Sequence, residues 1–420
     1  MKKNKKNTAK LNRKLTNFRT AKMAIMKEAR LIVKTEYIEI DSCVGRILAE
    51  DVKSKINVPP SDNSAVDGYG FNYLNSLKNK SLKIIGSSKP GEPFLQKLMP
   101  NTTVRVFTGA PLLKNKSSCN IDTVIMTEDC IIVGDKVFFK RLLKKGSNIR
   151  LKSEDIRKGN IIMSKGIKIR PYDVGYLASV GIKKLKVYKK INVGVFSTGN
   201  EIKKEGIKKN DFKIFDSNKL NLLSLLDRIG CHVQDLGIIK DDLNQTHKKL
   251  LESTNNCDLI ITSGGVAASE TDQIIKTINE IGKIFVWKLA IKPGRPIAFG
   301  KIKSKFFFGL PGNPVAVLVT FFMLIVDFIY TVSGRTKLPI KYNLLESNFN
   351  FQKKKGRTEW LRGSIKEYKN KLKVSKFNNE GSGILTSIAK TDGIIELNEK
   401  TEFITKGEML KFYKYEDFLN

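Results

Sequence analysis

Hydrophobic and polar positions alternate in regular blocks between residues 191 and 334 of this 420-residue chain. Short β-rich runs are each followed by a turn and by a segment whose Leu or Ile residues recur at helical spacing, which predicts helices with a buried face. The predicted strands are 191–197, 233–239, 258–262, 285–291, 297–302 and 306–310, and the predicted helices are 218–229, 241–253 and 272–281. Such alternation predicts an α/β domain with a doubly wound, mostly parallel sheet, whose loops gather at the carboxyl ends of its strands.

The regions on either side of this block have a different pattern. Residues 47–147 hold short β-rich runs and turn residues with weak helical periodicity, and strand-like segments recur at 360–365, 372–377 and 393–397. We therefore expect an α/β multidomain protein with four parts. These are a basic tail (1–17), a bipartite N-terminal region (18–190) with a β-rich insert at about 47–147, the central domain (191–334) and a small all-β C-terminal domain (335–420).

The longest apolar run, residues 315–332, reaches the lower limit of length for crossing a bilayer. It contains Thr320 and Asp327, and it follows the loop that closes the alternating block. We predict a buried core helix here and no membrane segment.

The chain is strongly basic, with 76 Lys and Arg against 41 Asp and Glu and a net charge of +35. A charge of this size raises the hypothesis of a nucleic-acid or membrane partner. Its distribution weakens that hypothesis, because residues 191–334 hold 18 basic and 14 acidic residues, whereas the first 34 residues hold 12 basic residues and one acid. No basic segment with interleaved aromatics is visible, so we expect small anionic substrates and no nucleic acid.

The basic N-terminal 34 residues are open to three interpretations: a transit peptide, a polybasic arm, or a solvated tail that leads into a helix. We favour the last, because five apolar residues begin a helical face: Ala24, Ile25, Ala29, Leu31 and Ile32. There is no apolar core of a secretory signal. The five cysteines are scattered without a C-x-x-C pair, which predicts a reducing, cytoplasmic location, and two histidines are too few for a His-built zinc site.

A Ser-Gly-Gly turn ends the strand predicted at 258–262. Ser263, Gly264 and Gly265 lead through a short loop to a helix that begins at Asp272. Glycines at such a point let backbone amides approach a phosphate, and the helix N-terminus favours an anion. A simple tight turn with Asp272 as N-cap explains the same residues, so both interpretations stay open.

Three cations follow at the end of the next predicted strand. Lys288 and Lys292 would share one strand face, because side chains alternate along a strand, and Arg295 lies on a Pro- and Gly-rich turn. This set suits a phosphate or an oxyanion. In so lysine-rich a chain, a solvated sheet edge is the alternative.

Carboxylates stand at the ends of several predicted strands and loops, at Glu201, Asp216 and Asp242. Acids at the ends of neighbouring parallel strands suit a hydrated divalent cation that bridges phosphate oxygens. Helix capping explains any one of them, but it explains the group less well.

Two N-terminal loops, 59–69 and 107–111, are typical surface turns when taken alone. Together with the segments above, they resemble the molybdopterin molybdenumtransferase family, which performs the last step of molybdenum cofactor synthesis. The resemblance is collinear from about residue 18 to the C-terminus, and its order makes it specific. It covers SDNSAVDGYG (61–70), FTGAP (107–111), GSNIRLKSEDI (146–156), FSTGNEI (196–202), FDSN (215–218), TSGGVAASETD (262–272), WKLAIKPGRPIAFG (287–300), GLPGNPVA (309–316), GRTEWLRG (356–363) and GSGIL (381–385).

The resemblance implies a reaction and an assembly. Members of the family take adenylylated molybdopterin and molybdate, insert the metal at the dithiolene and release AMP, with Mg²⁺ as cofactor. The implied fold has a split N-terminal region, a molybdopterin-binding α/β domain and a C-terminal β-barrel-like domain. A homodimer is implied, in which the N-terminal region of one subunit completes the cleft of the other, and other proteins of molybdenum cofactor biosynthesis are further expected partners.

The resemblance also assigns roles to residues of this chain. The pterin-phosphate end would be held by Ser263, Gly264, Gly265 and Asp272. Charge on pyrophosphate and molybdate would be offset by Lys288, Lys292 and Arg295. Near the metal or the anhydride would lie Glu201 and Asp242. Roles across the subunit interface would fall to Asp67, Thr108, Arg150 and Asp155. The same cleft would be faced by Pro311, Gly312, Asn313, Arg362 and Ser382.

Two departures from the family pattern define an alternative. Ala267, Ala268 and Ser269 stand where the family usually has Ser-Val-Gly, and Asn200 stands where it commonly has Asp. These changes remove a hydroxyl, a glycine and a charge, which is the pattern of a catalytically impaired, molybdopterin-binding paralogue. A basic nucleic-acid-binding protein with a borrowed α/β domain is the other alternative. Because the remaining charged positions match, we expect an active enzyme.

Overall fold

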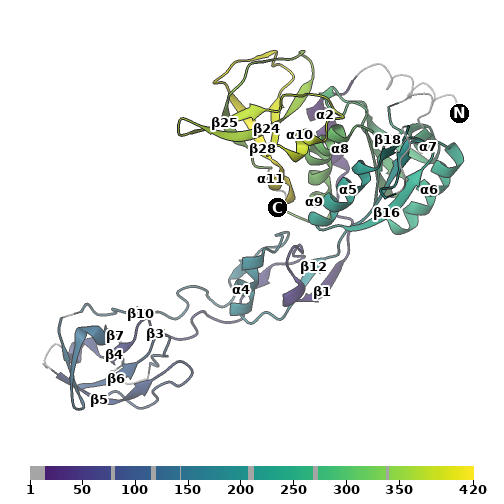
Figure 1. Ribbon diagram of the computed structural model, residues 1–420. Coiled ribbons are helices and arrows are strands. Elements are labelled where there is room, and N and C mark those ends of the chain that lie inside the picture. The colour runs from purple at the N-terminus through teal and green to yellow at the C-terminus, as the bar shows by residue number, and fades with distance from the viewer. Residues whose placement is uncertain are drawn as a thin grey trace.

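The computed structural model describes residues 15–76, 81–114, 120–141, 143–206, 212–267, 273–336 and 340–420. The molecule is elongated (Figure 1). Its body holds the central α/β domain with the C-terminal β domain beside it, and an arm built from residues 35–188 extends away from the body.

The centre of the body is a six-stranded sheet in the order β16-β13-β17-β21-β20-β18. The first four strands are mutually parallel, and β20 alone runs antiparallel to its two neighbours. The strands are β13 (Asn192–Thr198), β16 (His232–Ile239), β17 (Leu259–Ser263), β18 (Gly282–Trp287), β20 (Ala298–Ile302) and β21 (Lys305–Leu310). The prediction of a doubly wound, mostly parallel sheet is confirmed. A small pair, β14 (Ile202–Lys203) and β15 (Ile214–Phe215), flanks it.

The sheet is covered on both faces because both sides of its strands are apolar. In β17, Leu259 and Ile261 join one buried cluster, and Ile260 joins the other. Against the first cluster pack α5 (Ser217–Arg228) and the helix formed by α8 (Pro314–Thr320), η3 (Phe321–Ile325) and α9 (Val326–Val332). Against the second cluster pack α6 (Leu243–Asn256) and α7 (Gln273–Ile281).

The predicted core helix is confirmed as one continuous helix, Pro314–Val332, with a π-helical turn in its middle. Within the described ranges it is the one helix long and apolar enough to cross a bilayer, yet 83% of its apolar window is buried inside the protein. Asp327 lies on its outer side and pairs with Lys22 at 2.5 Å.

The strand predicted at 285–291 is wrong in its second half. β18 ends at Trp287, and Lys288 adopts a left-handed backbone conformation with φ +59°. The chain then turns, and Ile291–Lys292 forms β19, which pairs in parallel with a strand of the C-terminal domain. Lys288 and Lys292 therefore do not share a strand face. The alternation of apolar and polar residues continues from Trp287 to Lys292, but the chain turns at Lys288 and its next strand pairs with the barrel instead of the central sheet.

The C-terminal domain is a closed barrel. Its strands run in the order β24-β25-β22-β28-β26, and β26 pairs with β24 to close the ring. They are β22 (Asn343–Ser347), β24 (Thr358–Tyr368), β25 (Lys371–Lys376), β26 (Gly393–Leu397) and β28 (Met409–Lys414). The remaining elements are β23 (Phe351–Gln352), β27 (Phe403–Ile404), α10 (Thr386–Ala389) and α11 (Tyr415–Leu419). The expected β-barrel-like domain is confirmed.

Helix α2 (Phe18–Glu28) lies on the body, not on the arm. Ala21 and Ile25 are buried in the first cluster, and Glu28 pairs with Lys301 at 2.9 Å. The apolar face predicted for this segment is right only in part. The helix ends at Glu28, so Leu31 and Ile32 lie beyond it and are exposed.

The arm consists of three short strand pairs and a terminal sheet. Nearest the body lie β1 (Thr35–Glu39), β12 (Lys184–Tyr188), η1 (Ile40–Ser42) and α4 (Pro171–Ser179), followed by the pairs β2 (Val52–Lys53) with β11 (Ile161–Met163) and β3 (Asn63–Ser64) with β10 (Ile149–Arg150). The terminal sheet has the order β7-β4-β6-β5-β9-β8. Its elements are β4 (Gly68–Phe71), α3 (Tyr73–Ser76), β5 (Ser81–Ser88), β6 (Thr102–Val106), β7 (Thr123–Met126), η2 (Thr127–Asp129), β8 (Cys130–Val133) and β9 (Lys136–Phe139). Figure 1 shows this sheet at the far end of the arm.

Candidate functional site

A cavity of about 480 Å³ lies between the carboxyl edge of the central sheet and the barrel. From the central domain it is lined by Ala267, residues 291–296, residues 311–313 and Ala316; from the barrel it is lined by Arg357, residues 359–362 and residues 380–382. Parallel strands end at this edge, where α/β sheets commonly bind ligands. The cavity is therefore the candidate binding site.

The two domains share backbone hydrogen bonds at the floor of the cavity. In the β19–β24 pair, Lys292 lies directly opposite Glu359. Residues opposite each other in a parallel pair point to the same side of the sheet, so their side chains meet. A second link joins the far wall, where the Val315 amide donates to the Ser382 carbonyl oxygen at 3.0 Å.

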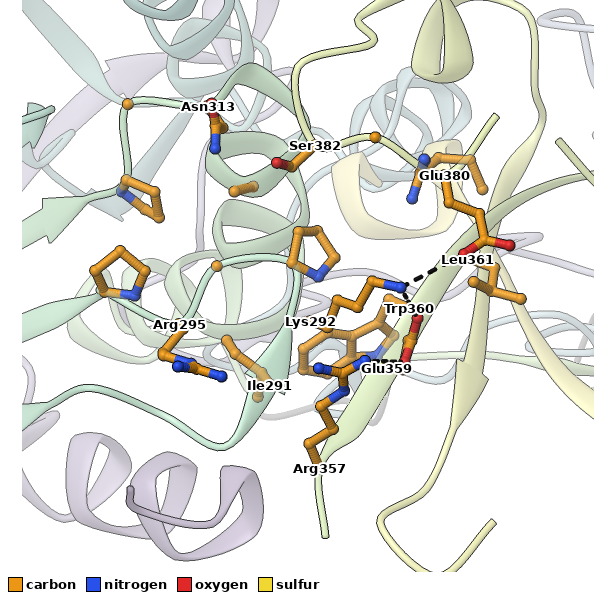
Figure 2. A pocket seen from close by; sticks show the side chains of 18 of the residues that line it. Ile291, Lys292, Arg295, Asn313, Arg357, Glu359, Trp360, Leu361, Glu380 and Ser382 are labelled. Carbon is orange, nitrogen blue, oxygen red and sulfur yellow. Dashed lines mark hydrogen bonds and ion pairs between the residues drawn. The ribbon is translucent and has the colours of Figure 1, made fainter. Parts of the chain in front are cut away.

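Four charged side chains form a network across this junction, which we call the junction network: Lys292, Arg357, Glu359 and Glu380 (Figure 2). The Lys292 ammonium lies 2.6 Å from Glu359 Oε1 and 3.5 Å from Glu380 Oε2. The Arg357 guanidinium lies 3.2 Å from Glu359 Oε2. The Glu359 side chain is 1% exposed, whereas that of Lys292 is 37% exposed and reaches the cavity.

Arg362 brings a further positive charge to the cavity. Only 3% of the residue is exposed, and burial lowers the pKa of its guanidinium. Its Nε donates to Ser387 Oγ at 2.9 Å, and a terminal nitrogen donates to the Asn379 carbonyl at 3.2 Å. Both of these hydrogen-bond partners are neutral, so the positive charge of Arg362 is held in place at the cavity and favours an anion there. Arg295 stands apart from the junction network on another wall (Figure 2).

The Ser-Gly-Gly turn is held rigidly at the ends of β17 and β21. Asn218 Nδ2 donates to Ser263 Oγ at 2.9 Å and to the Gly312 carbonyl at 2.7 Å. Gly264 has φ +96°, and a Cβ there would lie 2.6 Å from the Thr198 carbonyl oxygen. The turn thus requires glycine and brings the loop before Ala267 to the rim of the cavity.

Two of the three predicted carboxylates act as helix caps. Asp216 Oδ1 accepts from the Lys219 amide at 3.1 Å at the start of α5, and Asp242 Oδ1 accepts from the Gln245 amide at 2.7 Å at the start of α6. Glu201 is exposed on the loop after β13. Among the described residues there is no cluster of three or more His, Cys, Asp or Glu side chains that could hold a metal.

The loops that carry Glu201 and Asp242 nevertheless lie side by side. β13 and β16 are neighbouring parallel strands, and the Gly199 amide donates to the Ile239 carbonyl at 3.3 Å. The Asp241 amide donates to Asn200 Oδ1 at 3.4 Å. Asp242 uses one oxygen for the cap, and the Glu201 carboxylate lies over Gly199 on the neighbouring loop. Two carboxylates on neighbouring loops are a donor set that Mg²⁺ accepts when water and substrate supply the other ligands.

The four residues expected to act across a subunit interface lie on the arm, far from the cavity of their own chain (Figure 1). Asp67 accepts from the Thr108 amide at 2.7 Å and from its hydroxyl at 2.8 Å, and these bonds lower the pKa of Asp67. Arg150 lies in β10 opposite Asn63, and Asp155 is exposed after that strand. One chain alone does not bring these residues to its cavity.

The structure brings together part of the predicted set. Seven predicted residues line the cavity: Lys292, Arg295, Pro311, Gly312, Asn313, Arg362 and Ser382. Lys288 does not line it, since its ammonium lies 4.4 Å from the centre of a Trp287 ring. Asp272, Ala268 and Ser269 lie outside the described residues.

Sequence reasoning missed the roles of Arg357, Glu359 and Glu380 in the junction network. The segment 356–363 does indicate a buried carboxylate, because Glu359 directly precedes the apolar pair Trp360 and Leu361 in a β-rich run. Such a residue is buried only if it is paired. The partner could not be identified, because it lies 67 residues away in Lys292.

Comparison with known proteins agrees with this architecture. The MoeA N-terminal region (domain I and II) matches residues 16–181, the "Probable molybdopterin binding domain" matches 194–331, and the MoeA C-terminal region (domain IV) matches 345–415. A molybdopterin molybdenumtransferase of Haemophilus influenzae is 33% identical over 95% of this chain and 98% of its own length. One of Nostoc sp. is 28% identical over 89% of this chain and 87% of its own length.

Solved structures show the same likeness. The molybdopterin biosynthesis MoeA protein of Pyrococcus horikoshii superimposes with a TM-score of 0.83 at 26% identity, covering 96% of this chain and 100% of that one. Three family regions in the same order, full-length similarity and a shared fold all point to one group. The chain belongs to the MoeA family of molybdopterin molybdenumtransferases, which are transferases.

Proposed function

We propose that this enzyme inserts molybdenum from molybdate into adenylylated molybdopterin and releases AMP. The observation that carries the proposal is the cavity between the central sheet and the barrel, which combines four cations with two carboxylates. A mixed but net positive lining suits a small, multiply charged anion. A nucleic-acid partner would instead call for a continuous basic face.

The barrel side of the cavity is the proposed oxyanion end. Arg362 is buried with neutral hydrogen-bond partners, and Lys292 presents its ammonium from the junction network. Ser382 also lines the cavity, beside Asn313 (Figure 2). Together they would offset the charge of molybdate and orient it in a partly dehydrated site.

The central-domain side is the proposed end for the pterin and its phosphates. The turn Ser263-Gly264-Gly265 and the loop Pro311-Gly312-Asn313 are joined through the Asn218 amide. Glycine backbone at such a turn allows close approach of phosphate oxygens. Arg295 on the adjoining wall would offset the pyrophosphate charge.

Mg²⁺ would be held by Glu201 and Asp242, on the neighbouring loops after β13 and β16. When bound, it offsets charge on phosphate oxygens of the substrate anhydride. The chain's own contribution is to hold the two carboxylates at one edge, with the Asp242 backbone fixed by the start of α6.

We also propose that the enzyme works as a cytoplasmic homodimer. The arm reaches well beyond the body of its own chain (Figure 1). It could therefore bring Asp67, Thr108, Arg150 and Asp155 to the cavity of a second subunit, which is the family arrangement.

The direct test supplies the purified protein with adenylylated molybdopterin, molybdate and Mg²⁺, and measures AMP release and active cofactor formed. Molybdate-dependent AMP release is the expected result. Lys292→Ala should lower its rate at least tenfold, as expected for a lost charge-assisted contact of roughly 1.5–3 kcal/mol. Absence of molybdate-dependent release from the unaltered protein would refute the proposal.

A catalytically impaired paralogue is the second candidate, and Ala267 supports it. Its methyl group lines the cavity where the family usually places a hydroxyl. Such a paralogue would bind adenylylated molybdopterin without releasing AMP. The same assay, run beside a calorimetric titration with this substrate, separates the two candidates.

A further inference from the structure

Glu380 holds a position between two lysines at the mouth of the cavity. Its Oε2 lies 3.5 Å from the Lys292 ammonium, and its Oε1 lies 3.6 Å from the Lys376 ammonium. Its side chain is 37% exposed. Both contacts are long, so neither binds the carboxylate tightly.

The other carboxylate of the junction network is held very differently. Glu359 is 1% exposed, lies 2.6 Å from Lys292 and also pairs with Arg357. Withdrawing Glu359 would leave a buried charge without a partner, which is costly. Glu380 can swing toward water and toward Lys376 without that cost.

The Lys292 ammonium donates a hydrogen bond to Glu380 Oε2 and forms a close ion pair with Glu359. An oxyanion in the cavity would compete with Glu380 for the same ammonium. Since like charges repel, an oxyanion and the Glu380 carboxylate cannot both lie close to Lys292 without a penalty. Release of Glu380, the more exposed and less closely held of the two carboxylates, relieves this repulsion.

We propose that Glu380 is a displaceable counterion that occupies Lys292 until a tetrahedral oxyanion replaces it, with Lys376 receiving the released carboxylate. This inference rests on the proposed function, because it concerns the oxyanion end of the same cavity. Glu380 thereby keeps Lys292 in position in the absence of substrate. It also acts as a specificity-determining residue, since a dianion gains more than a monoanion from taking its place.

The first test measures molybdate binding by isothermal titration calorimetry, without the pterin substrate. Glu380→Gln removes the competing charge and should tighten binding about fivefold, the upper end of what one exposed ion pair is worth. The matched control is Glu367→Gln, which makes the same change of net charge at the far end of β24, roughly 26 Å from Glu359 along the strand. It should change the affinity less than about twofold, since charges at that distance are screened.

The second test asks whether Lys376 receives the carboxylate. Lys376→Gln should weaken molybdate binding more than Lys371→Gln, which removes an exposed lysine from the same strand. In the Glu380→Gln background, the two lysine variants should bind molybdate equally. Such a double-mutant cycle isolates the coupling between Glu380 and Lys376 from general charge effects.

The outcomes separate this inference from the proposed function. If Lys292→Ala binds molybdate as the unaltered protein does, the oxyanion end is misplaced and the proposed function loses its support. If Lys292→Ala loses binding but Glu380→Gln matches Glu367→Gln, the counterion role alone is refuted. Weaker binding by Glu380→Gln would also refute it, since Glu380 would then be helping to hold the anion.

Discussion

Gly264→Ala is the sharpest test of the Ser-Gly-Gly turn. The residue sits at the end of β17 with φ +96°, and an added Cβ would lie 2.6 Å from the carbonyl oxygen and 2.9 Å from the hydroxyl of Thr198. Thr198 ends the neighbouring strand β13, where its backbone pairs with Ile239 of β16. The clash therefore cannot be relieved by rotating a side chain.

The cost has two parts. A left-handed backbone conformation disfavours alanine by about 1–2 kcal/mol. Pushing a methyl group into a paired backbone adds about 1–3 kcal/mol, as in overpacked cores. The sum of roughly 2–5 kcal/mol can appear in either of two ways. If the turn keeps its path, the free energy of unfolding falls. If the turn moves, the proposed phosphate end is displaced, and a shift of about 1 Å should cost about 100-fold in rate.

The assay pairs thermal or urea unfolding with the rate of molybdate-dependent AMP release. Gly312→Ala is the control for stability, because Gly312 lines the cavity, has no positive φ and has no atom within 4 Å of an added Cβ. Its unfolding midpoint should stay within the range of about 0.5 kcal/mol usual for surface changes. The reasoning is refuted if Gly264→Ala has the same unfolding midpoint as Gly312→Ala and also releases AMP at the rate of the unaltered protein.

Three further predictions concern stability. Trp360 is 1% exposed, and its ring packs 4.7 Å from that of Phe18; Trp360→Ala should cost about 3–5 kcal/mol in chemical denaturation. Trp360→Phe should cost much less, because the buried indole N–H has no hydrogen-bond partner among the described residues, and equal losses for the two variants would contradict this. Glu359→Gln should cost about 2 kcal/mol by leaving Lys292 and Arg357 without their shared anion, while Glu367→Gln should cost almost nothing; equal midpoints would show that the junction network does not stabilise the fold. Burial, with Arg335 and Arg228 nearby, lowers the pKa of Lys168 from 10.5 to about 8. The unfolded chain then binds the Lys168 proton more tightly than the folded protein does. The free energy of unfolding, relative to that of Lys168→Met, should therefore rise between pH 8 and pH 10.5. A constant difference between the two proteins across that pH range would refute this prediction.

The central sheet was predictable because its signal is local. Each strand is apolar on both faces, each following helix has an apolar stripe, and strands such as β13 and β17 end within one or two residues of their predicted ends. Helix α6 begins at Leu243, directly after Asp242, which caps it. Burial and capping act over a few residues, so the sequence of the segment is enough to indicate them.

The cavity was predictable only in part, because its geometry depends on pairing between distant segments. The run from Trp287 to Lys292 reads as one alternating strand, but Lys288 breaks it and β19 pairs with the barrel. No local feature distinguishes a strand that continues from one that changes partner. The motif comparison identified Arg362 and Ser382 as facing the cleft, but it could not show that Glu359 neutralises Lys292.

The change of pairing partner at β19 leads us to expect that anion binding and domain docking are linked. Lys292 comes from the central domain, and the carboxylates and Arg362 that accompany it come from the barrel. The cavity therefore exists only while Ile291–Lys292 pairs with β24 and Trp360 packs against the central cluster. An anion that bridges both walls binds the docked arrangement and not the separated one, so it stabilises the junction by mass action. The excess charge of +35 over the whole chain contributes attraction at long range, but the selectivity of the site depends on how a few cations at this junction are paired.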